Sequence, residues 1–226
     1  IGSTKPGVVC IDTKTGTICD FDYLHALEPK IKINYIDLLY FDNDKNLWIK
    51  FLTQKDIFRF SNSKSVIKEN PMDFKDNEIV LYMYEDSFNN LWFCTTNGLI
   101  KYMKDIDTIH RFNISNGLPT NRVHGIIEDK NNNFWVTTFY GISKFDQKNN
   151  LFKNYDYTNG FMNENFGTCC KDKNGTLYFG GSNGIDYFNP DELLDNPFVP
   201  KIVITDFQLF NKSISPAIQN SVLTKS

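Results

Sequence analysis

Short apolar runs alternate with polar turns along most of this chain, and one arrangement of them returns at a nearly constant spacing. Its clearest copy is 128–145, where an acidic residue and an Asn-rich turn precede Trp135 and an apolar run. Gly141 then precedes a second apolar run. Short β-branched and aromatic runs bounded by Asn, Asp and Gly are typical of β-strands joined by tight turns. The stretch is therefore predicted to be a β-hairpin.

This hairpin can be aligned at four places without gaps, and the intervals between the aromatic residues that mark it are 44, 43 and 43 residues. An Asp lies six residues before each aromatic, and three copies have a Gly six residues after it. The first copy lacks the Gly, and 54–56 are expected to form its turn. The repeat residues are Trp48, Trp92, Trp135 and Tyr178, then Asp42, Asp86, Asp129 and Asp172, then Gly98, Gly141 and Gly184.

Further apolar segments flank each hairpin, so that one repeat holds four short strands. A period of about 43 residues with four strands and no helical periodicity is typical of β-propeller blades. The fold is predicted to be all-β, with four-stranded antiparallel blades that form a partial propeller of about four to five blades. Opening strands are expected at 36–41, 79–84, 123–127 and 166–170, and closing strands at 109–112 and 151–155.

The chain starts in the middle of a blade, because residues 1–11 align with the second half of a repeat. We expect a truncated first blade, and a piece taken from a longer protein, since the chain does not begin with Met. Either the blades close into a tight small ring or they form an arc of a larger one, which is the favoured alternative. An arc has open sheet edges, which invite pairing with another copy or with a missing portion of the same protein.

Composition excludes several classes of function. The chain has 226 residues, 41% of them hydrophobic, and a formal net charge of −3. The chain can therefore bury a sizeable core. It lacks the clusters of Lys and Arg that would bind nucleic acid or an anionic membrane. No apolar run reaches the roughly 18 to 20 residues of a membrane-spanning helix, and the first residues do not resemble a signal peptide.

Metal and enzyme chemistry find no support in the motifs, and no cofactor is expected. The five cysteines have no metal-ligand spacing. They are expected to be small buried residues, although Cys10 and Cys19 could pair as a disulfide on neighbouring strands. The Asp- and Asn-rich turns lack the Gly and Glu of a calcium loop, so their Asp residues are expected to accept backbone N–H bonds. His25, His110 and His124 are far apart, without a nucleophile motif.

The repeat, together with the linker Asn116-Gly117-Leu118-Pro119-Thr120-Asn121-Arg122-Val123, resembles the two-component regulator propeller repeat over roughly residues 1–190. That repeat builds the extracytoplasmic sensor region of hybrid histidine kinase/response regulators in glycan-degrading gut bacteria. The segment 201–212 looks like the first strand of the Ig-like domain that follows the last blade in this family. Two departures, the missing Gly after Trp48 and Tyr178 in place of Trp, bear on how regular the first and last blades are.

The expected domains are therefore blades at 1–190, a linker at 191–200, and at 201–226 the first strands of a truncated Ig-like domain or a closing strand of the propeller. The resemblance implies a periplasmic part of an inner-membrane protein, homodimeric in the full-length receptor, that binds an oligosaccharide and signals through the Ig-like domain to a kinase. The fragment itself would reach the membrane only through missing downstream segments, and it would not be an enzyme.

Candidate ligand residues follow from blade geometry. The turns between strands 2 and 3 and the connections between blades emerge at the same end, which is the usual ligand face. Aromatic faces stack on sugars, while amides, carboxylates and Arg bind hydroxyl groups. The candidates are Tyr140, Phe139, Arg122, Asn121, Asn97, Asn183 and Glu164. The alternatives are a scaffold that binds protein and, less favoured, a propeller enzyme that acts on carbohydrate.

Overall fold

The computed structural model describes residues 10–11, 13–19, 36–51, 56–61, 66–69, 74–75, 77–193, 206 and 208–213. The regular structure in these ranges is β-strand, apart from four 3-10 turns of three residues each. No helical segment in these ranges has the length and apolar character that crossing a membrane requires. The chain divides into two compact units, residues 1–192 and 193–226.

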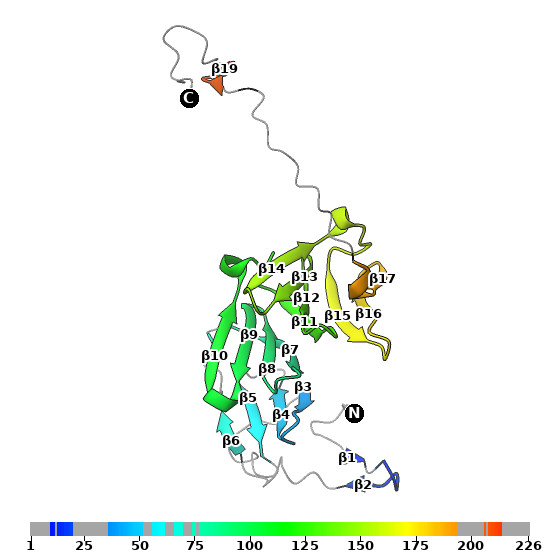
Figure 1. Ribbon diagram of the computed structural model, residues 1–226. Coiled ribbons are helices and arrows are strands. Elements are labelled where there is room, and N and C mark those ends of the chain that lie inside the picture. The colour runs from blue at the N-terminus through cyan, green and yellow to red at the C-terminus, as the bar shows by residue number, and fades with distance from the viewer. Residues whose placement is uncertain are drawn as a thin grey trace. The chain divides into compact units, whose positions relative to one another are not determined.

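The larger unit is built from antiparallel sheets whose strands follow one another in chain order (Figure 1). We call these sheets blades A to D. Three of them have four strands, and blade D has three in the described chain. Their strands are β3 (Ile36–Phe41), β4 (Leu47–Phe51), β5 (Ile57–Phe60) and β6 (Val66–Glu69) in blade A; β7 (Val80–Glu85), β8 (Leu91–Thr95), β9 (Gly98–Met103) and β10 (Thr108–Phe112) in blade B; β11 (Val123–Glu128), β12 (Phe134–Thr138), β13 (Gly141–Asp146) and β14 (Leu151–Tyr155) in blade C; and β15 (Phe166–Lys171), β16 (Leu177–Gly181) and β17 (Gly184–Phe188) in blade D.

These blades confirm the predicted fold class and place the strands within one or two residues of the predicted bounds. Each opening strand contains a register shift near its start, for example between Val123 and Gly125. A bulge of this kind increases the local twist of a strand. The turn expected at 54–56 after Trp48 falls largely outside the described residues.

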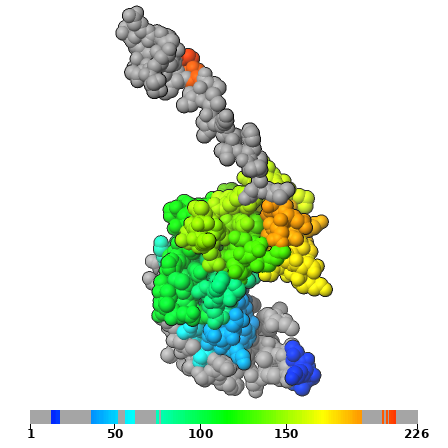
Figure 2. All heavy atoms as spheres, in the orientation of Figure 1, coloured from blue at the N-terminus to red at the C-terminus, as the bar shows by residue number. Residues whose placement is uncertain are grey.

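Neighbouring blades meet along their opening strands. Strand β11 lies beside both β7 and β15, and β3 lies beside β7. The coloured surfaces of the blades accordingly follow one another in chain order (Figure 2). Contacts between consecutive opening strands are what a propeller requires, because these strands lie innermost in its blades.

The tryptophans of the repeat provide the packing between blades. Trp48, Trp92 and Trp135 are completely buried. Each contacts an aromatic ring of the next blade: ring centroids lie 5.8 Å apart for Trp48 and Phe93, 4.7 Å for Trp92 and Phe134, and 4.9 Å for Trp135 and Phe188. All three tryptophans of the repeat therefore pack between blades.

Two small hairpins flank the blades in the sequence. The first joins β1 (Cys10–Ile11) to β2 (Ile18–Cys19) and places Cys10 opposite Cys19. Their side chains lie outside the described ones, so the disulfide stays a prediction. The second joins β18 (Gln208–Leu209) to β19 (Lys212–Ser213). Residues 194–200 of the expected linker and most of 201–226 lie outside the described residues, and the Ig-like strand also stays a prediction.

Candidate functional site

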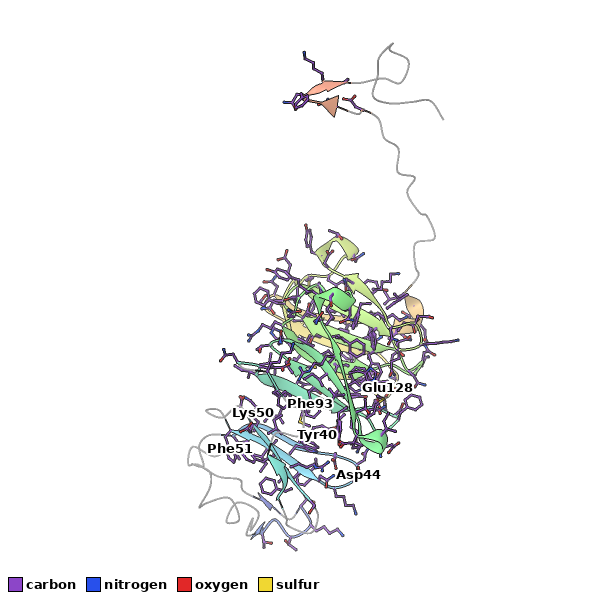
Figure 3. All side chains as sticks on the ribbon, turned by 90° about the vertical axis from the view of Figure 1, so that its left-hand side faces the viewer. Tyr40, Asp44, Lys50, Phe51, Phe93 and Glu128 are labelled. Carbon is purple, nitrogen blue, oxygen red and sulfur yellow. The ribbon has the colours of Figure 1, made fainter. Side chains whose placement is uncertain are left out.

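Each blade has two chemically different ends. Figure 3 shows Asp44 and Glu128 toward one side of the blades, and Lys50 and Phe51 toward the other. The side of Asp44 carries the turns between the first and second strands, and we call it the turn end. The opposite side carries the turns between the second and third strands and the connections between blades, and we call it the loop end.

At the turn end, the repeated Asp binds the repeated aromatic. Asp129 Oδ2 accepts a hydrogen bond from Trp135 Nε1 at 2.9 Å, and Asp129 Oδ1 accepts one from the backbone N–H of Asn133 at 2.9 Å. Asp42 and Asp86 repeat both bonds in their own blades. The predicted turn role of these carboxylates is therefore confirmed, and the indole bond adds a link between turn and core that the sequence analysis did not anticipate.

At the loop end, a Thr-x-x-Gly turn joins the second and third strands. In blade C, Thr138 Oγ1 donates to the Gly141 carbonyl at 3.0 Å and accepts from the Tyr140 N–H at 3.1 Å. Gly141 has φ +101°, and a Cβ on it would lie 2.2 Å from the Tyr155 carbonyl oxygen. Only glycine suits this position. The turn is thus held by its backbone and one threonine, which leaves the two residues between them free to vary.

Connections between blades contact these turns directly. The Gly141 N–H donates to the Glu164 carbonyl oxygen at 2.6 Å, which joins the turn of blade C to the connection between β14 and β15. In blade D, the Asn183 N–H donates to Asn163 Oδ1 at 2.7 Å. The prediction that both kinds of loop emerge at the same end is therefore confirmed.

Phe139 and Tyr140 are the aromatic candidates, and both reach solvent. Phe139 is 45% exposed and Tyr140 is 61% exposed. Their rings meet edge to face with centroids 5.4 Å apart. The backbone hydrogen bond from Gly141 to Glu164 brings the Phe139–Tyr140 turn close in space to the carboxylate candidate Glu164, which is exposed. The structure thus presents an open aromatic pair on a turn that is bonded to the backbone of Glu164.

Arg122 is held at the surface between blades C and D. Its Nε donates to His124 Nε2 at 3.0 Å, and His124 Nδ1 lies 2.7 Å from the Phe166 carbonyl oxygen. Because Nε2 accepts a hydrogen bond from Arg122, Nδ1 carries the ring hydrogen and donates to the Phe166 carbonyl oxygen. The imidazole therefore orients Arg122, whose side chain remains exposed.

The remaining candidates are partly engaged in structure. Asn121 Oδ1 accepts from the Ile114 N–H at 3.1 Å, which fixes the linker before β11. Asn183 Nδ2 donates to the Met162 carbonyl oxygen at 3.2 Å. Asn97 is half-buried in the turn of blade B, where its N–H donates to Thr95 Oγ1 at 3.0 Å. In the described chain, no hydrogen bond or ring contact joins Asn97 to the candidates of blades C and D.

Two polar groups in the blade connections at the loop end are buried, Glu78 and Asn163. Glu78 is 2% exposed, and both of its oxygens accept from Arg111 Nη1 at 2.9 Å. Asn163 is completely buried and donates from Nδ2 to Asp186 Oδ2 at 2.8 Å. Both groups lie in blade connections whose sequences look like exposed loops, and no periodic signal marks them as buried.

Met162 adds an exposed apolar surface that the sequence analysis did not single out. It is 61% exposed, its N–H donates to Asp186 Oδ1 at 3.0 Å, and its side chain reaches to within 3.8 Å of a Cβ built on Gly184. The loop end of blades C and D therefore combines aromatic and thioether surfaces with an arginine, a carboxylate and amides. In the part of the chain that the structure describes, no three His, Cys, Asp or Glu residues gather as metal ligands.

Comparisons with known proteins agree with this geometry. The two component regulator propeller family matches residues 73–97 and 117–140. "Histidine kinase P4" of Formosa agariphila is 28% identical over 141 residues, which are 62% of this chain and 7% of that protein. The extracellular domain of a protein described as a hybrid two component system of B. thetaiotaomicron superposes with a TM-score of 0.67 and 26% identity, over 82% of this chain and 27% of its own.

A virginiamycin B lyase from Staphylococcus aureus shows the same fold with a TM-score of 0.56 and 16% identity, over 80% of this chain and 62% of its own. At that identity the likeness concerns the fold alone. The chain spans about a quarter of the B. thetaiotaomicron domain and a small fraction of the Formosa agariphila kinase. Residues 73–97 and 117–140 thus match the two component regulator propeller repeat, and the blades resemble those of an extracellular domain from a two component system.

Proposed function

We propose that this chain is an oligosaccharide-sensing part of a hybrid two-component receptor and that the ligand contacts the loop end of blades C and D. The observation that carries the proposal is the exposed pair of Phe139 and Tyr140, held by a rigid turn beside Glu164. Sugars present C–H faces that pack on aromatic rings, and hydroxyl groups that hydrogen-bond to carboxylates, amides and Arg.

The backbone of this surface is fixed, whereas its candidate ligand groups are free to engage. Thr138 and Gly141 hold the turn, and His124 orients Arg122. A site held in place before binding loses less conformational entropy when the ligand arrives. In this proposal the two rings pack on a sugar, Glu164 accepts from its hydroxyl groups, and Arg122 donates to its oxygens. Asn121, Asn97 and Asn183 contribute amide groups at the margin of the surface.

The relatives suggest the setting of this sensor. The matched B. thetaiotaomicron structure is an extracellular domain, and the matched Formosa agariphila protein is a histidine kinase. We propose that the chain lies in the periplasm as part of an inner-membrane receptor, which these relatives support. Binding would be passed through an Ig-like domain that begins near residue 201, in a homodimer of the full-length protein. Membrane association would then depend on segments outside this chain.

A binding screen with matched variants tests the proposal. The chain would be titrated with neutral and acidic oligosaccharides while its melting temperature and heat of binding are measured. Replacing Tyr140 with Ala should lower affinity by about tenfold, which corresponds to a loss of about 1.4 kcal/mol. Replacing Tyr187 with Ala is the control, because this tyrosine is equally open, with 68% exposed, but lies on β17.

Equal losses in both variants would contradict a site at Tyr140. If no saccharide binds, the oligosaccharide reading fails, and a protein-binding scaffold takes its place. Detection of a cleaved saccharide in the same mixtures would instead establish an enzyme.

A further inference from the structure

The turn end contains three equivalent junctions between neighbouring blades, and the middle one differs from the other two. We call these junctions the A–B, B–C and C–D seams. In each seam, the turn between the first two strands of one blade faces the turns of the next blade. Because the repeat aligns the seams residue by residue, a difference between them reflects a change in side chains and not a change in fold.

The A–B seam is closed by charge. Lys104 Nζ donates to Asp44 Oδ2 at 2.6 Å and to Glu85 Oε1 at 2.5 Å. The Lys104 side chain is only 10% exposed, and that of Glu85 only 3%. Burial opposes the charge of Lys104, but its hydrogen bonds to Asp44 and Glu85 raise the pKa of this lysine. The lysine thus fills the space between the two blades.

The C–D seam is also closed by charge, with a different donor. Asp191, which follows β17, pairs with Lys130 and accepts from Asn131 Nδ2 at 2.9 Å. A second contact comes from Lys171, whose Nζ donates to the Glu128 carbonyl oxygen at 2.6 Å. Both flanking seams therefore have a cation and a carboxylate bound across them.

The B–C seam has no such pair between described residues. Phe88 occupies the repeat position of Asp44, and Gln147 occupies that of Lys104. An open cleft of about 500 Å³ lies here, within the size range of small-molecule sites, roughly 300–1,000 Å³. Its lining includes Phe88, Asn90, Lys101, Asn132, Asn133, Asp146 and Lys148. The Asp146 carboxylate is bound within its own turn, where Oδ1 accepts from the Lys148 N–H at 2.9 Å and Oδ2 accepts from Asn149 Nδ2 at 2.7 Å.

Two asparagine side chains at this cleft are held by hydrogen bonds and can still accept further ones. Asn90 and Asn133 each direct Nδ2 to both oxygens of the repeat Asp in their own blade. Their side-chain oxygens accept no hydrogen bond from a described residue, so two amide acceptors are held rigidly at the cleft. Phe88 is 58% exposed, and its backbone N–H is held by Asp86 Oδ1 at 2.9 Å.

The two lysines at the cleft differ in their freedom. Lys101 Nζ lies 5.1 Å from the centre of the Trp92 ring and donates to Gln147 Oε1 at 2.7 Å. Burial lowers the pKa of Lys101, although Asp86 and Glu128 oppose the shift. Lys148 is exposed, and its ammonium group forms no ion pair with a described residue. Lys148 is therefore the cation that can meet a ligand.

We propose that the B–C cleft is a second ligand site, which binds a sugar unit that carries a carboxylate or sulfate group. Phe88 packs on the C–H face of the sugar ring, because an exposed aromatic ring offers the apolar surface that such a face needs. Asn90 and Asn133 accept hydrogen bonds from its hydroxyl groups, and Lys148 pairs with its acidic group. The site lies at the opposite end of the blades from Tyr140 and does not depend on that residue.

The test measures amide chemical-shift changes and affinity for the whole 226-residue chain. The probes are a galacturonic acid tetramer, a chondroitin sulfate tetrasaccharide and neutral cellotetraose. We expect the acidic probes to shift the amides of 86–90 and 130–133, and the neutral probe to bind more weakly. Phe88→Ala and Lys148→Ala should each weaken binding at these amides by about tenfold. Lys173→Ala, at an exposed lysine in the turn between the first two strands of blade D, should leave binding unchanged.

A double replacement closes the cleft and keeps the fold. Phe88→Asp with Gln147→Lys copies Asp44 and Lys104 from the A–B seam, so it should form the missing ion pair and abolish binding in this cleft while the melting temperature is preserved. Binding that survives this replacement with its amide shifts intact would overturn the proposal. So would the absence of shifts at 86–90 and 130–133 with every probe, even if Tyr140-dependent binding at the loop end is observed. Loss of only the Tyr140-dependent binding would count against the proposed function alone.

Discussion

The two ends of the blades differ in how faithfully they repeat. At the turn end, Asp42, Asp86 and Asp129 make the same bonds to the indole and to the neighbouring Asn in three blades. At the loop end, the blade connections are held in a different way each time. Glu78 binds Arg111, Asn121 binds the Ile114 N–H, and Asn163 binds Asp186.

This difference separates the residues that build the blades from those that are free to recognise a ligand. A hydrogen bond that is found in every copy of the repeat is explained by folding alone, because each copy must stabilise the same turn and bury the same aromatic residue. A contact found in one blade only is not required by the repeat. The candidates for binding are therefore found where the copies diverge, at Phe139 and Tyr140 and in the B–C cleft.

The largest effect should come from removing a buried tryptophan. Trp135→Ala should lower the free energy of unfolding by about 3–5 kcal/mol, because it empties a fully buried site against Phe188. Tyr178→Ala at the same repeat position should cost only about 1 kcal/mol, because this ring is half-exposed. Urea denaturation followed by circular dichroism measures both. Equal losses would show that blade D is as well packed on this face as blade C.

A smaller loss is expected from a Cβ at the loop-end turn. Gly141→Ala should cost about 3 kcal/mol, since its φ is +101° and the new Cβ would meet the Tyr155 carbonyl oxygen. Gly160→Ala is the matched control, with φ +95° and no atom within 4 Å of its Cβ, and should cost about 1 kcal/mol. Denaturant unfolding of both variants compares them directly. Similar costs would mean that the turn of blade C adjusts and is not rigid.

The repeated carboxylate should matter less than the tryptophan that it binds. Asp129→Ala should lower the free energy of unfolding by about 2 kcal/mol, because it leaves the Trp135 Nε1 and Asn133 donors without their acceptor. Asp172→Ala should cost less, since Asp172 is more exposed and its bond from the Tyr178 hydroxyl is long, at 3.3 Å. Thermal unfolding at neutral pH ranks the two. A larger loss in Asp172→Ala than in Asp129→Ala would contradict a special contribution of the hydrogen bond from the Trp135 indole to stability.

The smallest effect is expected from two buried tyrosines, Tyr40 and Tyr84, whose contribution to stability should change only at alkaline pH. Burial, together with the nearby Glu85, raises the pKa of Tyr40 to about 12, and burial together with Glu128 does the same for Tyr84. The folded pKa lies above that of the unfolded chain, so the stability contributed by the neutral phenols is present below pH 10 and is lost as pH rises through 12. The urea concentration at the unfolding midpoint should decrease as the pH is raised from about 10 to about 12, and the decrease should be smaller in Tyr84→Phe. An unchanged decline in that variant would contradict the assignment.

The fold could be predicted because the same pattern of strands and turns occurs several times in the sequence. Each blade on its own is ambiguous, but the fixed distance from Asp129 to Trp135 and Gly141 in successive copies excludes chance and defines the strands. This spacing does not predict which side chains form hydrogen bonds between neighbouring blades. The carboxylate of Glu128 accepts from the N–H and hydroxyl of Ser87 at 2.9 and 2.7 Å, although 41 residues separate them. Such a bond joins positions of two different copies, so aligning the copies does not reveal it.

The candidate site was predictable in its position but not in its detail. Blade topology places Phe139, Tyr140 and Glu164 at one end, and the structure agrees. Burial there depends on partners far along the chain, as for Glu78 and Arg111, and therefore the local sequence does not reveal it. The B–C cleft was missed because it arises from two substitutions in an otherwise closed seam, which become visible only after Lys104 is seen to fill the equivalent space.

The bonds of Asp191 have a mechanical consequence. This residue lies at the point where the chain leaves blade D, and it is bound to Lys130 and Asn131 of blade C. A force applied to the chain beyond residue 192 is therefore shared between two blades from the start, instead of peeling β17 away from its sheet. The contacts of Asp191 with blade C therefore protect the end of β17 from being pulled out of its sheet.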